Sequence, residues 1–211
     1  MRFRAIVLLT STSLLAAPLS WSIPGASLDD GGSSPQATAS PQDAKVYADA
    51  LALMKQGDDL GAAAAAREAY GSARTKLQSL VGRSPQFAEA WNALGYTQRK
   101  LGSFDDSLAS YAKALELKPG FPEALEYRGE AYLRLNRIHD AKQAYLDLFA
   151  SNRKIAATLL ESMKVWIKTQ QGSHAVDASE VTDLQQWVQE RSQIATQTAA
   201  LTREGAAASW R

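Results

Sequence analysis

The sequence of 211 residues contains no cysteine and only two histidines. Without cysteine the chain has no disulfides, thiolate zinc sites, cysteine nucleophiles or lipids attached through cysteine. The two histidines, His139 and His174, are not spaced as a metal-binding pair on one helix face. No glycine-rich phosphate loop stands between a strand and a helix. We therefore expect no enzyme, with no catalytic residue, no metal site and no cofactor.

The chain also lacks an excess of charge of either sign. It has 23 Lys and Arg residues against 22 Asp and Glu residues. Nucleic acids and anionic membranes are bound through clustered basic surfaces, which a balanced composition gives no reason to expect. We therefore expect a partner that is neither a nucleic acid nor a membrane surface.

The first 22 residues have the pattern of a secretory signal peptide. Arg2 and Arg4 precede an apolar run from residue 5 to 19. Small residues at Ser20 and Ser22 predict cleavage after Ser22. The alternative is an uncleaved anchor, but the run of about 15 residues is shorter than the roughly 20 that span a bilayer. We expect an exported protein, periplasmic or secreted, without stable membrane insertion after cleavage.

Residues 23–42 are rich in Pro, Gly, Ser, Ala and Asp. Such a segment has too few apolar side chains to offset the entropy lost on ordering, which predicts a flexible linker. Beyond it, no run of β-branched residues alternates with polar ones over the length of a strand. The remaining residues are therefore predicted to be helical.

An internal repeat of 34 residues organises the middle of the chain. This offset brings eight pairs of identical residues into register: Pro85 and Pro119, Phe87 and Phe121, Glu89 and Glu123, Ala90 and Ala124, Gly95 and Gly129, Leu101 and Leu135, Asp106 and Asp140, and Tyr111 and Tyr145. Each unit is predicted to form two antiparallel helices. Asn136 replaces the turn glycine of the first unit, and asparagine tolerates a left-handed backbone.

These residues resemble the tetratricopeptide repeat family. The resemblance is carried by Trp91 to Gly95, Gly102, Phe104, Tyr111, Ala114 and Pro119, and in the next unit by Gly129, Tyr132, Ala141 and Tyr145. It departs from the family at Gln98, usually tyrosine, and at Ser107, usually alanine. The resemblance implies an all-α fold, a short α-solenoid of helix hairpins with a capping helix and a C-terminal helix.

The predicted array spans residues 43–170. A degenerate repeat covers 43–87, with extra helical turns around the alanine-rich residues 61–68, and regular repeats cover 88–121 and 122–155. A capping helix is predicted at 155–170, because the last repeat of a solenoid has an open apolar face. The extension 171–211 holds a final helix at about 180–203, in which Trp187, Ile194 and Leu201 recur every seven residues. This helix packs on the repeats or forms a homotypic coiled coil, and the pattern leaves both open.

The resemblance implies that the first helices of the repeats line a concave groove. It places there Glu89, Asn92, Tyr96, Arg99, Lys100, Glu123, Glu126, Tyr127, Glu130 and Arg134. The predicted partner-binding residues are Asn92, Tyr96, Arg99, Glu126, Tyr127 and Glu130. We expect an adaptor that holds a partner peptide or protein in this groove. The alternative is a self-associating structural protein, a possible homodimer, that uses the C-terminal helix.

Two expectations about stability accompany this register. Trp91 and Tyr111 should each be fully buried, so that either alanine substitution costs about 3–5 kcal/mol, whereas the loss of His139 should have almost no effect. Tyr96 and Tyr127 should be exposed, so that their replacement with alanine should leave the melting temperature nearly unchanged.

Overall fold

The computed structural model describes residues 40–171, 173 and 175–208. The predicted signal peptide, most of the predicted linker and His174 lie outside this range. Eight helices and no strands make up the described part, so the prediction of an all-α fold is confirmed. The helices are α1 (Pro41–Leu60), α2 (Ala64–Arg83), α3 (Ala88–Lys100), α4 (Phe104–Leu117), α5 (Pro122–Arg134), α6 (Ile138–Ser151), α7 (Arg153–Gln170) and α8 (Ala178–Ala208).

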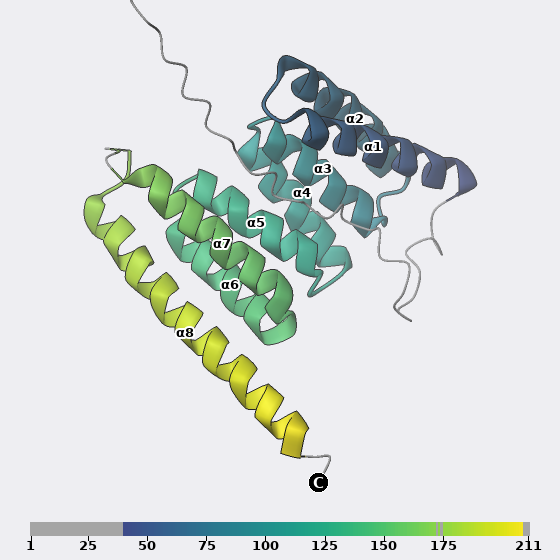
Figure 1. Cartoon of the computed structure of the whole chain (residues 1–211). Coiled ribbons are helices and arrows are strands. Elements are labelled where there is room, and N and C mark those ends of the chain that lie inside the picture. The colour runs from purple at the N-terminus through teal and green to yellow at the C-terminus, as the bar shows by residue number, and fades with distance from the viewer. Residues whose placement is uncertain (1–39, 172, 174, 209–211) are drawn as a thin grey trace, which may run out of the picture.

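The helices stack as consecutive antiparallel hairpins (Figure 1). The pair α1–α2 lies at one end, α3–α4 and α5–α6 follow, and α7 packs against both α5 and α6. The turns use left-handed backbone where it is expected, with φ of 86° at Gly102 and 58° at Asn136. Asn136 therefore replaces the turn glycine of the first unit as its side chain predicts.

The first hairpin is longer than the next two. Helices α1 and α2 have 20 residues each, whereas α3 and α5 have 13 and α4 and α6 have 14. The extra residues form additional helical turns, and the alanine run divides between a short turn and the start of α2. Gly57 nevertheless contacts Tyr70 as Gly95 contacts Tyr111, so the first hairpin keeps the packing of the regular repeat.

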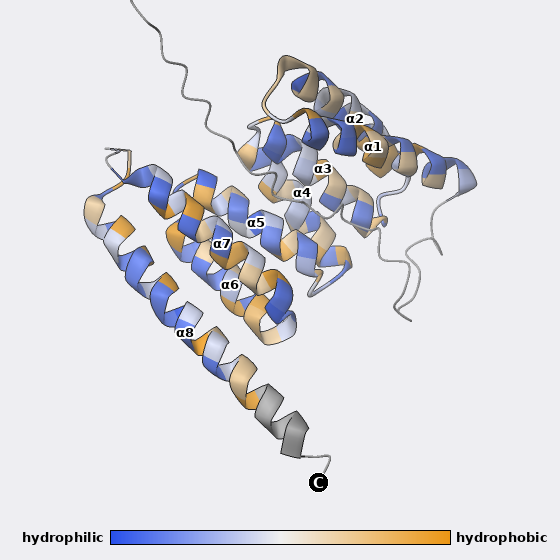
Figure 2. Cartoon of the chain, viewed as in Figure 1, coloured by the Kyte–Doolittle hydropathy of each residue, from blue (hydrophilic) through white to orange (hydrophobic). Residues whose placement is uncertain are grey.

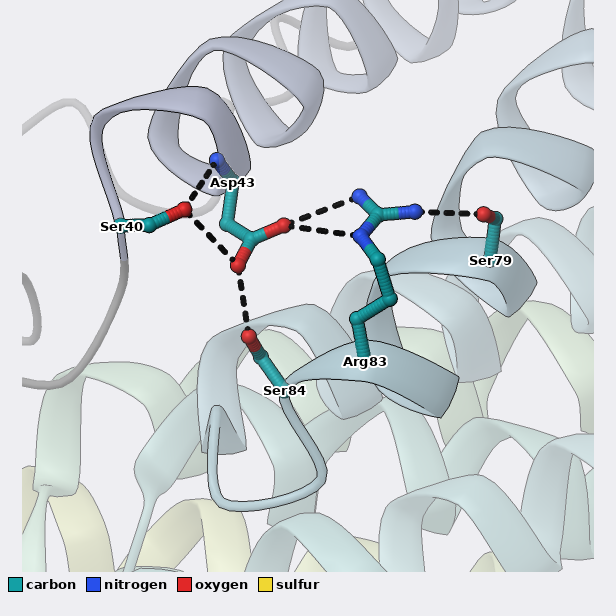
Figure 3. Close-up of polar contacts among 5 residues, drawn as sticks. All are labelled: Ser40, Asp43, Ser79, Arg83 and Ser84. Atoms are coloured by element: carbon teal, nitrogen blue, oxygen red, sulfur yellow. Dashed lines mark hydrogen bonds and ion pairs between the residues drawn. The ribbon is translucent and has the colours of Figure 1, made fainter.

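Helix α1 begins at Pro41, inside the segment predicted to be linker, because Ser40 caps it and proline fits the first turn. Asp43 in that turn holds α1 to the end of α2 (Figure 3). Its carboxylate accepts hydrogen bonds from Arg83 at 2.9 Å and from Ser84 at 2.7 Å. The hydrogen bond from Ser84, followed by that from Arg83, lowers the pKa of Asp43, so it is charged at neutral pH.

Helix α8 packs on the array only through its first half. Leu184 and Val188 are buried against α7, and the indole of Trp187 lies 5.2 Å from the ring of Tyr145 on α6. Further along, Ile194 and Leu201 are exposed, and the helix extends past the end of α6 (Figure 1). Apolar and polar residues alternate irregularly along α8 (Figure 2). None of the helices in the described part is long and apolar enough to cross a membrane.

The repeat packing predicts opposite effects for two helical glycines. A Cβ atom on Gly95 would lie 2.6 Å from the Tyr111 ring, whereas one on Gly71 would meet nothing within 4 Å. Gly95→Ala should therefore lower the free energy of unfolding by about 1–3 kcal/mol through overpacking. Gly71→Ala should raise it by about 0.5–1 kcal/mol through helix propensity. Urea denaturation followed by circular dichroism measures both, and changes of the same sign would contradict the packing.

Candidate functional site

The predicted partner-binding residues lie on the facing sides of α3 and α5. Asn92, Tyr96 and Arg99 follow each other at i, i+4 and i+7 and share one side of α3. Glu126 and Glu130 share the corresponding side of α5, and Glu126 occupies the same repeat position as Asn92. The structure thus brings the residues of the two repeats together as the register predicts.

The expectation that these side chains are exposed is wrong. Asn92 and Tyr96 are each 2% exposed, Tyr127 is 4% exposed, and Glu126 and Glu130 are also buried. The reason is that aromatic side chains fill the space between the two helices. The rings of Tyr96 and Tyr127 lie 5.2 Å apart in an edge-to-face arrangement, which is favourable for aromatic pairs.

Arg99 contacts both of these rings. Its guanidinium is 5.3 Å from the centre of the Tyr96 ring and 5.4 Å from that of Tyr127, within the range of a cation–π contact. Its Nη1 forms an ion pair of 2.5 Å with Oε2 of Glu130. Burial lowers the pKa of Arg99, but the negative charge of Glu130 together with the contacts to Tyr111 and Tyr96 outweighs this effect and raises the pKa, so the guanidinium stays charged.

Two further contacts tie this cluster to the neighbouring helices. Ser162 on α7 donates a hydrogen bond of 2.6 Å to Oε1 of Glu130. Toward α1, Oδ1 of Asp58 accepts from the hydroxyl groups of Tyr96 at 2.6 Å and Tyr70 at 2.5 Å. Asp58 also pairs with the ammonium group of Lys100 at 2.9 Å. Although burial opposes it, these hydrogen bonds lower the pKa of Asp58.

Sequence reasoning missed Asp58, Tyr70 and Ser162 as parts of this site. The extra helical turns of the first hairpin shift its register, so the 34-residue offset does not align Asp58 with its neighbours. Gly57 faces the ring of Tyr70 as Gly95 faces that of Tyr111, and this glycine–tyrosine pair is the signal that could have placed Tyr70 and the neighbouring Asp58.

Some buried polar atoms of the cluster have no hydrogen-bond partner. They include Oδ1 of Asn92 and Oε1 of Glu126. A buried polar group without a partner costs about 1–3 kcal/mol. Folded proteins rarely keep such groups, and each one in a native structure requires an explanation. A bound partner that supplies the missing donors is one such explanation.

Glu126 has no cation within ion-pair distance among the described residues. Burial raises its pKa to about 8, and the negative charge of Glu130 adds to the effect. The carboxyl group therefore retains its proton in the folded protein at a pH where the unfolded chain has released it. The folded state binds more protons between the ordinary pKa and about 8, so stability falls as pH rises through this range.

Glu126→Gln should remove this pH dependence. At pH 5 the variant and the wild type should be almost equally stable, because the wild-type carboxyl is protonated in the folded state. At pH 8.5 the variant should be more stable by roughly 3–5 kcal/mol, because no charge has to be buried. Thermal unfolding across this pH range measures the difference, with Glu116→Gln, exposed on α4, as the control. Parallel pH profiles for the wild type and Glu126→Gln would contradict the burial of this carboxyl.

No other part of the described chain gathers groups with evident chemistry. No cluster of three or more His, Asp or Glu side chains in these ranges could hold a metal ion. His139 is exposed at the start of α6. A cleft of about 560 Å³ lies between α7 and α8, with Ile167 and Val188 buried beside it and lysine and glutamine side chains at its rim.

Comparison with known proteins supports the repeat. Residues 88–121, which cover α3, α4 and the turn that follows, match the tetratricopeptide repeat family. Over 124 residues the chain is 29% identical to the tetratricopeptide repeat domain-containing protein PYG7, chloroplastic, of Arabidopsis thaliana. This alignment covers 56% of the chain and 41% of that protein, so the chain spans about two fifths of the length of this relative. The predicted resemblance to tetratricopeptide repeats is confirmed for the matched residues.

Proposed function

We propose that this protein is an adaptor that binds a partner peptide or protein on the side of the array where α3 and α5 face each other. Tetratricopeptide repeats generally mediate protein–protein interaction, and the chain carries such a repeat at 88–121. The observation that carries the proposal is the pair of buried oxygen atoms without partners on Asn92 and Glu126. A peptide main chain supplies N–H donors, which are the groups that these two oxygens lack.

Partner binding here requires a small opening between side chains, because the predicted partner-binding residues are buried. Asn92 is the best probe, since its Oδ1 forms no hydrogen bond that a substitution would break. Tyr96, Tyr127 and Glu130 support the site through their packing and through the ion pair with Arg99. Their substitution therefore changes stability together with binding.

A peptide selection tests this proposal. Dodecapeptides displayed on phage are selected on the purified protein, and the affinity of the best peptide is measured by fluorescence anisotropy. Asn92→Leu should weaken binding by more than about 1 kcal/mol. Gln143→Leu, an exposed amide on α6, should leave it unchanged. Failure to select any peptide, or equal binding to both variants, would overturn the concave site.

Self-association through α8 is the second candidate function. It is favoured by Ile194, which is 37% exposed, and by Leu201, which is 68% exposed, both on the half of α8 that leaves the array. Analytical ultracentrifugation at micromolar concentration distinguishes the two functions. A dimer that Ile194→Glu converts to a monomer supports self-association, and a wild-type monomer excludes it.

Export of the protein is proposed from the sequence. Arg2, Arg4 and the apolar run that follows them support it. N-terminal sequencing of the protein purified from its source should find a start near Ile23. Intact Met1 in a soluble cytoplasmic fraction would overturn export.

A further inference from the structure

The buried cluster between α3 and α5 carries one more negative charge than it can pair. Glu130 is neutralised by Arg99 at 2.5 Å. Glu126, one helical turn earlier on α5, has no cation at ion-pair distance in the part of the chain that the structure describes, although it is only 5% exposed. A buried carboxylate is tolerated only when it is paired or protonated. Because Glu126 is not paired, its carboxyl group is expected to be protonated in the free protein.

A second acceptor accompanies Glu126. Oδ1 of Asn92 is buried and has no partner, and Asn92 is 2% exposed at the equivalent position of the preceding repeat. The two oxygens lie on α3 and α5, whose side chains meet through Tyr96 with Tyr127 and through Arg99 with Glu130. What is missing at both is a hydrogen-bond donor, and at Glu126 also a positive charge.

We propose that Glu126 and Asn92 form an anchor for a lysine side chain of the bound partner, an inference that rests on the proposed function. An ammonium group brings three donors and one charge on a slender, flexible stem. It therefore satisfies both acceptors and enters through a smaller opening than a planar guanidinium. The rings of Tyr96 and Tyr127, which lie beside the cluster, favour a cation over an anion.

The unpaired negative charge of Glu126 also excludes an anionic group of the partner from this position. A phosphate or a partner's terminal carboxylate would add negative charge beside Glu126 and Glu130. The one buried cation of the cluster, Arg99, already holds Glu130. The arrangement thus differs from a groove that grips carboxylates, which requires unpaired cations.

Binding of a lysine should release a proton from Glu126. Because burial holds the pKa of Glu126 at about 8, the ammonium must replace the proton at neutral pH. The affinity for a lysine-containing peptide should therefore rise between pH 6 and pH 8.5. Calorimetry in two buffers of different ionisation enthalpy measures the released proton directly, and Glu126→Gln should release none.

The decisive experiment uses the peptides selected on phage. In the best peptide each lysine is replaced in turn by norleucine, which keeps the stem and removes the charge. At one position this change should weaken binding to the wild type about tenfold, the effect of losing a charged hydrogen bond. Binding to Glu126→Gln should then be almost insensitive to the same change, whereas Glu116→Gln, on the exposed side of α4, should behave as the wild type.

The outcomes separate the two proposals. Selected peptides that lack a required lysine, or an equal norleucine effect in the wild type and Glu126→Gln, would overturn the anchor. If the selected peptides bind Asn92→Leu more weakly than the wild type in either case, the adaptor function stands without the lysine anchor. If arginine replaces the lysine with full affinity, the preference for ammonium is wrong. The absence of any selected peptide overturns the adaptor function and the anchor together.

Discussion

Replacement of Tyr111 with alanine should lower the free energy of unfolding by about 3–5 kcal/mol, the range for removing a large buried side chain. Tyr111 is 0% exposed, and its ring packs against Gly95, where a Cβ atom has no room. The same ring lies 6.3 Å from that of Tyr127 on α5. Its loss therefore leaves a cavity both within one hairpin and toward the next.

Trp91→Ala is the informative comparison for this prediction. The expectation that Trp91 is fully buried is wrong, because the structure places it at intermediate exposure. Its indole N–H donates to the carbonyl oxygen of Pro85 at 2.9 Å, so the side chain lies against the turn before α3. We expect a smaller loss than for Tyr111→Ala and almost none for His139→Ala. Chemical denaturation measures all three, and equal effects would contradict the repeat register.

The helices of the regular repeats were predictable because their packing repeats in the sequence. The 34-residue offset makes visible the pairs of Gly95 with Gly129 and of Tyr111 with Tyr145. Both glycines are closely packed, Gly95 against Tyr111 in its own hairpin and Gly129 against Leu159 of α7. The left-handed backbone of Asn136 followed from the same alignment. Residue chemistry and the 34-residue period therefore suffice to predict the helices and turns of the two regular repeats.

The burial of the predicted partner-binding side chains was not predictable in the same way. Whether a tyrosine on α3 points to solvent or fills a gap depends on the distance between successive hairpins. That distance is set by contacts far apart in the sequence, such as the hydrogen bond from Tyr96 to Asp58. A polar cluster such as Arg99 with Glu130 is invisible to patterns that sort residues only as apolar or polar.

Tyr96→Ala should be as destabilising as Tyr111→Ala, by about 3–5 kcal/mol. This reverses the expectation of an unchanged melting temperature, because the ring is 2% exposed and is in edge-to-face contact with Tyr127. Its hydroxyl also donates to Asp58 on α1, which ties the first hairpin to the second. The substitution should therefore loosen α1 and α2 more than α6 and α7. Hydrogen exchange followed by mass spectrometry should show faster exchange in the first hairpin.

Tyr96→Phe separates the two contributions of this side chain. Phenylalanine keeps the contacts of the ring with Arg99 and Tyr127 and removes only the hydrogen bond of 2.6 Å to Asp58. Asp58 still accepts from Tyr70 and pairs with Lys100, so it is not left without partners. The expected loss is about 1–2 kcal/mol, that of one hydrogen bond to a charged group. If Tyr96→Phe and Tyr96→Ala lost equal stability, the hydroxyl and not the ring would hold the first hairpin to the array.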